Sequence, residues 1–451
     1  MKKAVVSVLL SLIMTTGLLA GCGSAAGTST GAASETGAAG SSAAAATGAS
    51  TASTAATAST AAASAAAAST AAASQEKTGA GIDASKIKIG VIYIGDENEG
   101  YTEAHMTGIV EMKKALGISD KQVIEKKNIP EDESCYDAAA DLADQGCNII
   151  FGTSFGHEDY IIQAAKDYPN IQFCHATGYK AASSKLSNMH NYFSAIYEAR
   201  YTSGVVAGMK LNEMIQSGKI TKDKAKIGYV GAYPYAEVIS GFTSFYLGAK
   251  SVCPTVTMDV QYTNSWASMD KESEVASQLI ANGCVLISQH ADTTGAPSTC
   301  EQKGVPCVGY NVDMTSVAPK EALTSAAIDW GKYYTYAVQS VIKGNKIDTD
   351  WCKGFESGAV NITPLNTAAV AQGSADKVKE VEAAIQSGSL HVFDTSTFTV
   401  KGSSLEKLIS SDAKNYGKYS KYVSGGYYHE SEVQSAPSFD IIIDGITSEA
   451  K

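Results

Sequence analysis

The sequence predicts an α/β protein made of two similar lobes, each with a doubly wound parallel sheet, joined by a hinge and facing each other across a cleft. From Lys86 onward, short apolar runs alternate with helical stretches, a pattern typical of βαβ units and parallel sheets. The pattern of the first half then recurs in the second half at a nearly constant offset. A duplicated α/β chain therefore accounts for most of the sequence.

The elements of the first half follow in order along the chain. Apolar runs of four to eight residues predict strands, and longer stretches with helical spacing predict helices. Gly117 and Gly146 fit helix ends, where a left-handed backbone favours glycine. The expected strands are 87–94, 123–129, 148–151 and 171–175, and the expected helices are 102–116, 136–144 and 158–167.

Three matches in the same order relate the two halves. Residues 86–91 match 224–229, residues 145–150 match 282–287, and residues 195–201 match 327–333. The offsets are 138, 137 and 132, and this slow drift favours duplication over a generic likeness among βαβ segments. We expect lobe 1 to span 83–198 with a return of about 323–345, and lobe 2 to span 199–322 and about 346–451.

The loops that follow the predicted strands are polar, small or aromatic, unlike the strands themselves. They are 95–96, 152–155, 175–178, 288–292 and 310–313. Ligands of parallel α/β sheets bind beyond the carboxyl ends of the strands. Two lobes that face each other through such loops predict a cleft that closes on a small solute by hinge motion.

The N-terminal segment has the pattern of an export signal followed by a flexible tether. Lys2 and Lys3, an apolar run over 4–14 and the lipobox-like 19–22 predict a lipoprotein signal peptide over 1–21 with lipidation at Cys22. An ordinary secretion signal with a chance cysteine is the alternative. Residues 22–82 are mostly Gly, Ala, Ser and Thr, which predicts a flexible lipid-anchored tether, with an Ala-rich helix as the alternative.

Charge and cysteine content exclude several classes of protein. The formal net charge is −11 and the basic residues are scattered, so no nucleic-acid partner is expected. No motif implies a cofactor, and the cysteines lack metal-ligand spacing. Cys147, Cys174 and Cys284 lie in or beside apolar runs and are expected as buried thiols, whereas a Cys300–Cys307 bridge remains open.

A series of motifs runs in order along the predicted folded part. They are 98–105 with Gly108, 175–180, 191–193, 197–201, 263–266, 289–292 and 309–314. With the lipobox, the tether and the duplicated lobes, they resemble the basic membrane protein family, which includes purine nucleoside receptors. The resemblance implies a type I periplasmic-binding-protein fold and a lipid-anchored, extracytoplasmic solute-binding protein of an ABC importer. Its partners would be a purine-like solute, the ABC permease and ATPase subunits and, through the lipid anchor alone, the cell membrane.

Two departures from the nucleoside receptors concern the ligand. Those receptors have Asp-Lys-Ser-Phe-Asn where this chain has Asn-Glu-Gly-Tyr-Thr at 98–102, and they carry a ribose-binding lysine that 325–330 lacks. The resemblance is nearer to receptors of a free base such as adenine. A receptor of the same fold for another heterocycle or a sugar, and a ligand-reporting sensor lipoprotein, remain alternatives.

Four aromatic residues are candidates for stacking on a planar ligand. Tyr101 comes first, with Trp266 as the opposite wall, because aromatic faces bind flat heterocycles. Phe155 and Trp330 are weaker candidates, since either can be a packing residue. A staple at the helix start is the alternative for Tyr101.

Four polar residues are candidates for hydrogen bonds to the ligand. Asp292 and Asp313 end strands of the second lobe and can accept from an amine, a ring NH or a hydroxyl, although each also suits a helix N-cap. Asn98 and Ser154 can add amide and hydroxyl contacts. His175 and His290 are ambiguous, because a strand-end histidine is as often structural.

Two further features need an explanation. Arg200 is the only arginine of the chain, and its place near the crossing between lobes predicts a structural role at the hinge, with an anion clamp as the alternative. Residues 152–156 match G-x-S-x-G after a predicted strand, and Asp313 and His391 follow in the order of a serine hydrolase. The second half has no matching elbow, so we expect no enzyme and no catalytic residue.

The end of the chain is rich in tyrosine. Tyr416, Tyr419, Tyr422, Tyr427 and Tyr428 cluster with Lys and Gly. We expect a surface strand pair here that completes the second lobe.

Overall fold

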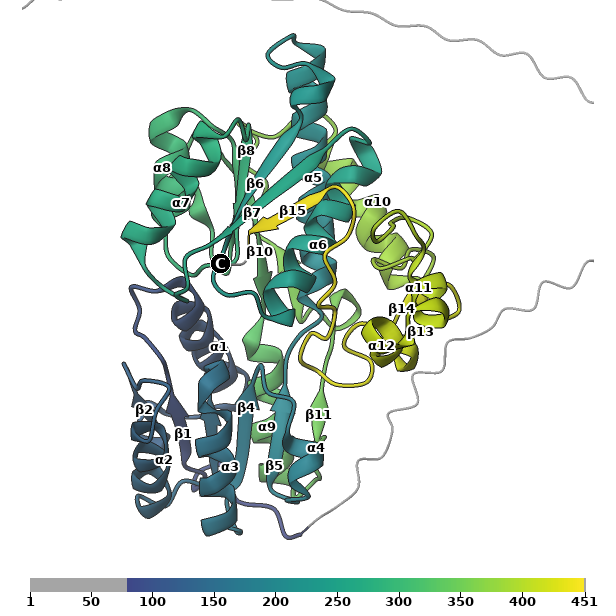
Figure 1. Cartoon of the computed structure of the whole chain (residues 1–451). Helices are drawn as coiled ribbons and strands as arrows, with labels where there is room; N and C mark the ends of the chain where they lie inside the picture. Colours follow the sequence, from purple (N-terminus) through teal and green to yellow (C-terminus); the bar gives the residue numbers. More distant parts are fainter. Residues whose placement is uncertain (1–78, 450–451) are drawn as a thin grey trace, which may run out of the picture. The chain divides into compact units, whose positions relative to one another are not determined.

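The computed structural model of the chain describes residues 79–449. The predicted signal peptide, the lipidation site Cys22 and nearly all of the expected tether lie outside the described residues. Within the described part, two lobes each contain one central sheet (Figure 1).

The sheet of the first lobe is parallel throughout. Its strands are β1 (Ile89–Ile92), β2 (Val123–Lys126), β3 (Ile149–Gly152), β4 (Gln172–Ala176), β5 (Met189–Tyr192) and β11 (Asp350–Trp351), in the order β11-β5-β4-β3-β1-β2. Helices α1 (Gly100–Leu116) and α9 (Trp330–Lys343) pack on one face, and α2 (Ser134–Asp144) and α3 (Glu158–Asp167) on the other. The short helix α4 (Ala181–Ser184) precedes β5.

The sheet of the second lobe has seven strands. They are β6 (Lys226–Gly231), β7 (Thr257–Tyr262), β8 (Leu286–Gln289), β9 (Cys307–Tyr310), β10 (Ala322–Ile328), β12 (Val360–Ile362) and β15 (Ile446–Glu449), in the order β12-β10-β9-β8-β6-β7-β15. Only β12 is antiparallel to its neighbour. Helices α5 (Ile196–Gln216) and α6 (Ala236–Val252) pack on one face, and α7 (Met269–Ala281) and α8 (Gly295–Lys303) on the other.

The two sheets repeat one topology. The order β2-β1-β3-β4-β5 of the first lobe recurs as β7-β6-β8-β9-β10 in the second. In each, the strand order reverses direction next to the first strand, between β1 and β3 and between β6 and β8. Such switch points open the crevice in which doubly wound sheets bind ligands.

The expected elements of the first half are present with small shifts of their ends. Residues 87–94 are predicted as a strand and form β1 over Ile89–Ile92, and the helix predicted over 158–167 is α3. Helix α1 ends at Gly117, whose φ of 68° is the left-handed conformation expected there. Gly108 of α1 lets α9 approach, because a Cβ at this position would lie 2.8 Å from the Cβ of Trp330.

The chain passes between the lobes at three places: from β5 to α5, from β10 to α9, and from β11 to β12. These crossings differ from the expected boundaries. Residues 323–328 were expected in the return to lobe 1, but they belong to β10, which pairs with β9 in the second sheet. Residues 350 and 351 were expected in lobe 2, but they form β11 beside β5. The return to lobe 1 is therefore α9 together with β11.

The C-terminal segment is more varied than the expected strand pair. After α10 (Ser374–Gln386), which packs on α5, it contains α11 (Leu405–Ser411), α12 (Ala413–Tyr416), β13 (Val423–Ser424) and β14 (Tyr427–Tyr428). Strands β13 and β14 pair with each other in a separate two-stranded sheet. The second sheet is completed instead by β15, which lies parallel to β7.

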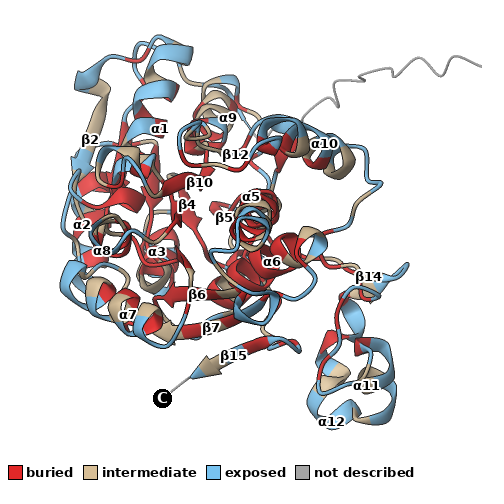
Figure 2. Cartoon of the chain, turned by 90° about the horizontal axis from the view of Figure 1, so that it is seen from above, coloured by how far each residue is buried: buried red, intermediate tan, exposed pale blue. Residues whose placement is uncertain are grey.

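Burial follows the two sheets. Figure 2 shows the buried residues along the strands and on the helix sides that face them, with α11 and α12 largely exposed. All eight cysteines of the described range are free thiols; seven are buried, including Cys300 and Cys307, which form no bridge.

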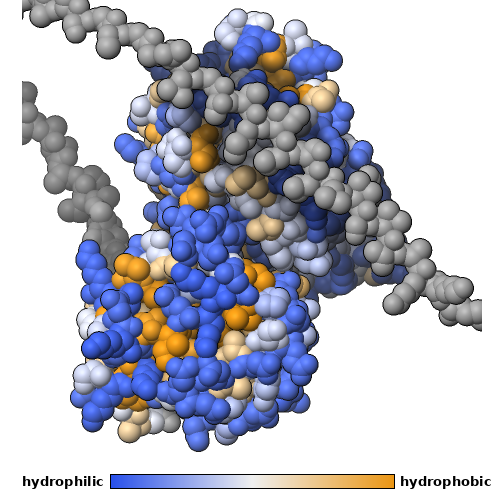
Figure 3. Space-filling model, turned by 90° about the vertical axis from the view of Figure 1, so that its left-hand side faces the viewer, coloured by the Kyte–Doolittle hydropathy of each residue, from blue (hydrophilic) through white to orange (hydrophobic). Residues whose placement is uncertain are grey.

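The surface is mostly hydrophilic on the side drawn in Figure 3, where the apolar areas are separate from one another. Among the described residues, no helix is both long and apolar enough to cross a membrane.

Candidate functional site

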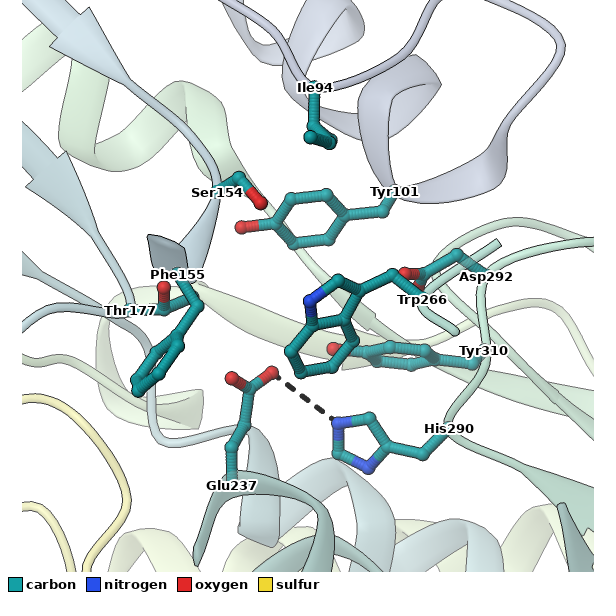
Figure 4. Close-up of a pocket in the computed structure, with 10 residues that line it drawn as sticks. All are labelled: Ile94, Tyr101, Ser154, Phe155, Thr177, Glu237, Trp266, His290, Asp292 and Tyr310. Atoms are coloured by element: carbon teal, nitrogen blue, oxygen red, sulfur yellow. Dashed lines mark hydrogen bonds and ion pairs between the residues drawn. The ribbon is translucent and has the colours of Figure 1, made fainter. Parts of the chain in front are cut away.

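A pocket lies between the lobes, beyond the carboxyl ends of β1, β3, β6 and β8 (Figure 4). It therefore meets both switch points of the duplicated fold. The pocket holds about 340 Å³ of empty space, part of it open to solvent. Its lining side chains are Ile94, Tyr101, Ser154, Phe155, Thr177, Glu237, Trp266, His290, Asp292 and Tyr310.

The two lobes touch across this pocket. The backbone N–H of Gly100 in α1 donates to the carbonyl of Asp292 in the second lobe at 3.0 Å. On another side, the ring of Phe155 in the first lobe stacks on Tyr235 of the second, with centroids 5.4 Å apart. The structure thus shows the lobes closed over the pocket.

Tyr101 is held rigidly at the start of α1. The Glu99 carboxylate caps this helix by accepting from the backbone N–H groups of Tyr101 and Thr102. The Tyr101 hydroxyl donates to the carbonyl of Thr153 at 2.7 Å. Its ring meets the rings of His105 and Trp330 edge-on, at centroid distances of 4.5 and 5.9 Å. These contacts preorganise one aromatic wall of the pocket.

The other aromatic walls come from the second lobe. Trp266 lies in the loop after β7 and Tyr310 is the last residue of β9. Figure 4 shows the rings of Tyr101, Trp266 and Tyr310 around one cavity, with Phe155 across from them. Tyr233 meets Trp266 edge-on, at 5.2 Å between ring centroids. The arrangement suits a flat solute, because aromatic faces stack on planar rings.

Two carboxyl groups, that of buried Asp292 and that of the mostly buried Glu237, give the pocket its polar character. Burial raises the pKa of Glu237 to about 7, and its Oε1 lies 3.4 Å from Nε2 of His290. Burial, together with the negative charges of Glu99 and nearby Glu272, raises the pKa of Asp292 well above its ordinary value. The Asn311 amide donates to Asp292 at 2.9 Å. A carboxyl group that keeps its proton near neutral pH can donate as well as accept a hydrogen bond.

His290 adds a neutral polar group. Burial lowers its pKa well below the ordinary value, and the positive charge of Arg200 lowers it further. The pocket therefore presents neutral or acidic groups to a ligand. Nothing in its lining supplies a positive charge for an anionic group.

Arg200 lies behind the pocket wall. It is fully buried in α5, its Nη1 donates to the carbonyl of Gln289 at 2.6 Å, and its guanidinium group lies 3.8 Å from the ring centroid of Tyr310. These contacts join the crossing helix to the ends of β8 and β9. They agree with a structural role near the hinge, and the guanidinium is not part of the pocket lining.

Five of the eight predicted ligand residues line the pocket: Tyr101, Ser154, Phe155, Trp266 and Asp292. The other three lie elsewhere, which corrects their assignment. Asn98 donates to Asp96 in an exposed turn, and Asp313 accepts from the backbone N–H of Thr315 as a helix N-cap. Trp330 is buried behind Tyr101 and stacks on His105 at 3.9 Å.

Glu237 is the main lining residue that the sequence reasoning missed. It occupies the first turn of α6, after the first strand of the second lobe. The offset of 138 between the halves makes Glu237 the residue equivalent to Glu99 of the first lobe in the sequence repeat. Extending the sequence match between the two halves from the strands to the loop after β6 would have identified Glu237 as a candidate. Ile94, Thr177 and Tyr310 were likewise not among the candidates.

The serine of the G-x-S-x-G match has no catalytic partners. The Ser154 hydroxyl donates to Glu131 at 2.7 Å, and the nearby His175 bonds the Ser154 carbonyl through Nε2 at 2.7 Å. A serine nucleophile needs its hydroxyl within reach of a histidine base. The geometry here instead fixes the loop after β3. Within residues 79–449, no cluster of three potential metal ligands is present either.

An aromatic slot with buried carboxyl groups, enclosed by two lobes that meet across it, defines a solute-binding protein that closes over a small molecule. Comparison with known proteins gives the family. Residues 86–391 match the Bmp family, described as ABC transporter substrate-binding protein PnrA-like, and the chain belongs to this family. Such proteins work outside the cytoplasm with the permease and ATPase subunits of a transporter. The family membership confirms the predicted recognition and the expectation that the chain is not an enzyme.

Two curated relatives illustrate the family. The chain is 35% identical over 321 residues to a purine-binding protein of Brucella abortus, covering 70% of this chain and 85% of that protein. It is 34% identical over 252 residues to a Haloferax volcanii protein named as an ABC transporter glucose-binding protein, covering 56% of this chain and 60% of that protein.

Solved structures support the fold. An ABC transporter solute-binding protein of Aeropyrum pernix K1 matches with a TM-score of 0.57 at 14% identity, over 74% of this chain and 98% of that one. A second solute-binding protein, from Conexibacter woesei, matches with a TM-score of 0.53 at 19% identity, over 68% and 98% of the two chains. These matches confirm the predicted type I periplasmic-binding-protein fold.

Proposed function

We propose that this protein captures a purine-type heterocycle, a free base such as adenine, and delivers it to the permease of an ABC importer. The observation that carries the proposal is the closed slot in which Tyr101 and Trp266 supply aromatic walls while Glu237 and Asp292 supply buried carboxyl groups. The lipid anchor at Cys22 would hold the receptor at the outer side of the cell membrane.

The chemistry of a purine base complements these groups. Its flat rings stack on aromatic faces, and its exocyclic amine and ring NH are hydrogen-bond donors that carboxylate oxygens accept. Ring nitrogens of the base accept from a carboxyl group that keeps its proton, as the raised pKa values of Glu237 and Asp292 allow. The purine-binding relative of Brucella abortus supports the same ligand class.

The pocket favours an uncharged ligand over a nucleotide. Arg200 lies behind Tyr310 and outside the lining, and the ionisable lining groups are acidic apart from a neutral histidine. A phosphate in this environment would lose its hydration and meet no positively charged lining group, which makes its burial costly.

A sugar is the second candidate ligand. The relative of Haloferax volcanii is named as a glucose-binding protein, and aromatic walls with carboxyl groups also fit a sugar ring. Hydroxyl groups would then take the place of the amine and ring NH as donors to Glu237 and Asp292.

A thermal-shift screen of the purified protein decides between these candidates. The ligands are adenine, guanine, hypoxanthine, their nucleosides and glucose. A specific ligand at 100 times its dissociation constant adds about 2.7 kcal/mol of stability, and Trp266→Ala should abolish most of this gain. If glucose alone raises the melting temperature, the purine proposal fails; if nothing does, both candidates fail.

A further inference from the structure

Three buried carboxyl groups gather where the two lobes touch, and we call them the interlobe carboxyl cluster. Glu99, before α1, belongs to the first lobe, whereas Glu272 of α7 and Asp292 after β8 belong to the second. Their exposed fractions are only 9%, 0% and 6%. Beside them the Gly100 N–H donates to the Asp292 carbonyl across the cleft at 3.0 Å. Closing of the lobes therefore brings Glu99 to the two carboxyl groups of the other lobe.

Amide groups, and not cations, hold the cluster. Glu99 accepts from two backbone N–H groups at the start of α1, at 2.8 and 3.0 Å. Glu272 accepts from the backbone N–H of Thr293 at 3.2 Å, and Asp292 from the side-chain amide of Asn311 at 2.9 Å. Among the described residues, no lysine, arginine or histidine forms an ion pair with any of the three. Any negative charge on the cluster is thus buried without a counter-ion.

The surroundings of the cluster add negative charge to it. Asp96 acts on Glu99, and Glu237 acts on Asp292. Lys127 lies near Asp96 but pairs with Glu97 at 2.8 Å. The other ionisable groups on the surrounding elements are Glu103, Arg200, Asp270, Lys271, His290 and Asp313. These include three acidic residues against two basic ones, so they do not compensate the cluster either.

Buried like charges disfavour full ionisation of the cluster. Burial raises the pKa of Glu272 to about 7, with a contribution from the charge of Glu99. Burial also raises the pKa of Glu99, and burial together with the charges of Glu99 and Glu272 raises the pKa of Asp292 well above its ordinary value. When the lobes separate, water reaches Glu99 and the repulsion across the cleft is lost. The closed form therefore holds protons that the open form releases.

We propose that closing of the lobes takes up protons at the interlobe carboxyl cluster, so that this receptor closes on its ligand more readily in an acidic medium. Glu99 and Glu272 do not line the ligand pocket, so both act on the closing equilibrium and not through contact with the ligand. A carboxyl group whose pKa is raised in the closed form favours closing below its ordinary pKa, and this contribution is lost as the pH rises through the raised value. For Glu272 that window extends from 4.5 to about 7.

Titration calorimetry with adenine between pH 5.5 and 7.5, in buffers of different ionisation enthalpy, measures both the affinity and the protons taken up. The dissociation constant of the wild type should rise by about fivefold or more over this range, since each proton taken up changes it by up to about tenfold per pH unit. Glu237 titrates in the same range, but its contribution is common to the wild type and the variants below. The difference between them therefore isolates the cluster.

Glu99→Gln and Glu272→Gln each remove one charge and keep an acceptor oxygen. In each variant both the proton uptake and the rise of the dissociation constant should fall to about half of the wild-type values or less. Glu103→Gln on α1 and Glu274→Gln on α7, at exposed positions, are the matched controls and should keep the wild-type pH profile. A purely structural role of Glu99 or Glu272 would change the affinity equally at every pH.

The inference rests on the proposed function only for its ligand, and a ligand-free measurement separates the two. The Gly100 N–H is bonded to the other lobe in the closed form, so its protection from hydrogen exchange, corrected for the intrinsic pH dependence, reports closing. We expect this protection to decrease from pH 5.5 to 7.5 in the wild type and to change less in Glu99→Gln. If adenine binds with equal proton uptake in the wild type and both variants, the inference is refuted and the proposed function stands. If adenine does not bind, the proposed function fails, and protection of Gly100 that is independent of pH refutes the inference separately.

Discussion

Replacing Gly100 with alanine tests how far ligand affinity depends on the hydrogen bond that crosses the cleft. The Gly100 N–H donates to the carbonyl of Asp292 at 3.0 Å, and a Cβ at this position would lie 3.1 Å from that same oxygen. The added methyl group must push the carbonyl away, which weakens a bond that exists only in the closed form. A protein hydrogen bond contributes about 0.5–1.5 kcal/mol, so the dissociation constant should rise roughly 2- to 13-fold.

The same change should leave the fold of each lobe intact. Gly100 is the first residue of α1, where alanine is a better helix former than glycine. Titration calorimetry would measure the affinity, and thermal unfolding without ligand would measure stability. Gly79→Ala, at a position with open space around the Cβ, is the matched control. Unchanged affinity in Gly100→Ala, or an equal loss in both variants, would refute the reasoning.

Two further predictions concern the pocket. Burial raises the pKa of Glu237 from 4.5 to about 7, so between these values the native state keeps a proton that the unfolded chain has lost, and stability falls as pH rises. Urea unfolding at several pH values measures the free energy of unfolding of Glu237→Gln relative to the wild type. This difference should rise in favour of the variant from pH 4.5 to 7, by at most about 3 kcal/mol, and stay constant above pH 7. A difference that does not change with pH would contradict the prediction. In binding titrations, Tyr101→Ala should cost about 1–3 kcal/mol of affinity, whereas Tyr101→Phe keeps the ring and loses only the bond to Thr153. Equal losses in the two Tyr101 variants would argue against stacking.

The architecture was largely predictable because burial on both faces leaves a strong pattern in the sequence. Strands such as 149–152 read as uninterrupted apolar runs, since parallel sheets are covered on both sides. The offset between the halves then required two lobes of one topology. The exact crossing points were not predictable, because only Asp329 separates β10 from α9 and the placement of 322–328 depends on pairing with β9.

The candidate site was predictable only in part, because residue type does not fix direction. Asp313 and Asn98 follow strands as ligand residues do, yet both make local hydrogen bonds within turns. Short polar side chains often bond to their own loop in this way. Trp330 has the chemistry of a stacking wall, but the close approach of α1 and α9 buries it one layer behind Tyr101.

The edges of the two sheets have a consequence for the order in which the chain acquires its structure. The first lobe lacks helix α9 and its edge strand β11 until residues 330–351 are available, long after β5 at 189–192 has been made. The second lobe waits still longer, because β15 at 446–449 covers the outer side of β7. A chain emerging from its N-terminal end would therefore leave the edge of β5 unpaired until residue 351 and the outer edge of β7 unpaired until residue 449, and unpaired edges invite mispairing. Shielding by a chaperone during synthesis or export would matter more for this protein than for one whose domains close one after the other.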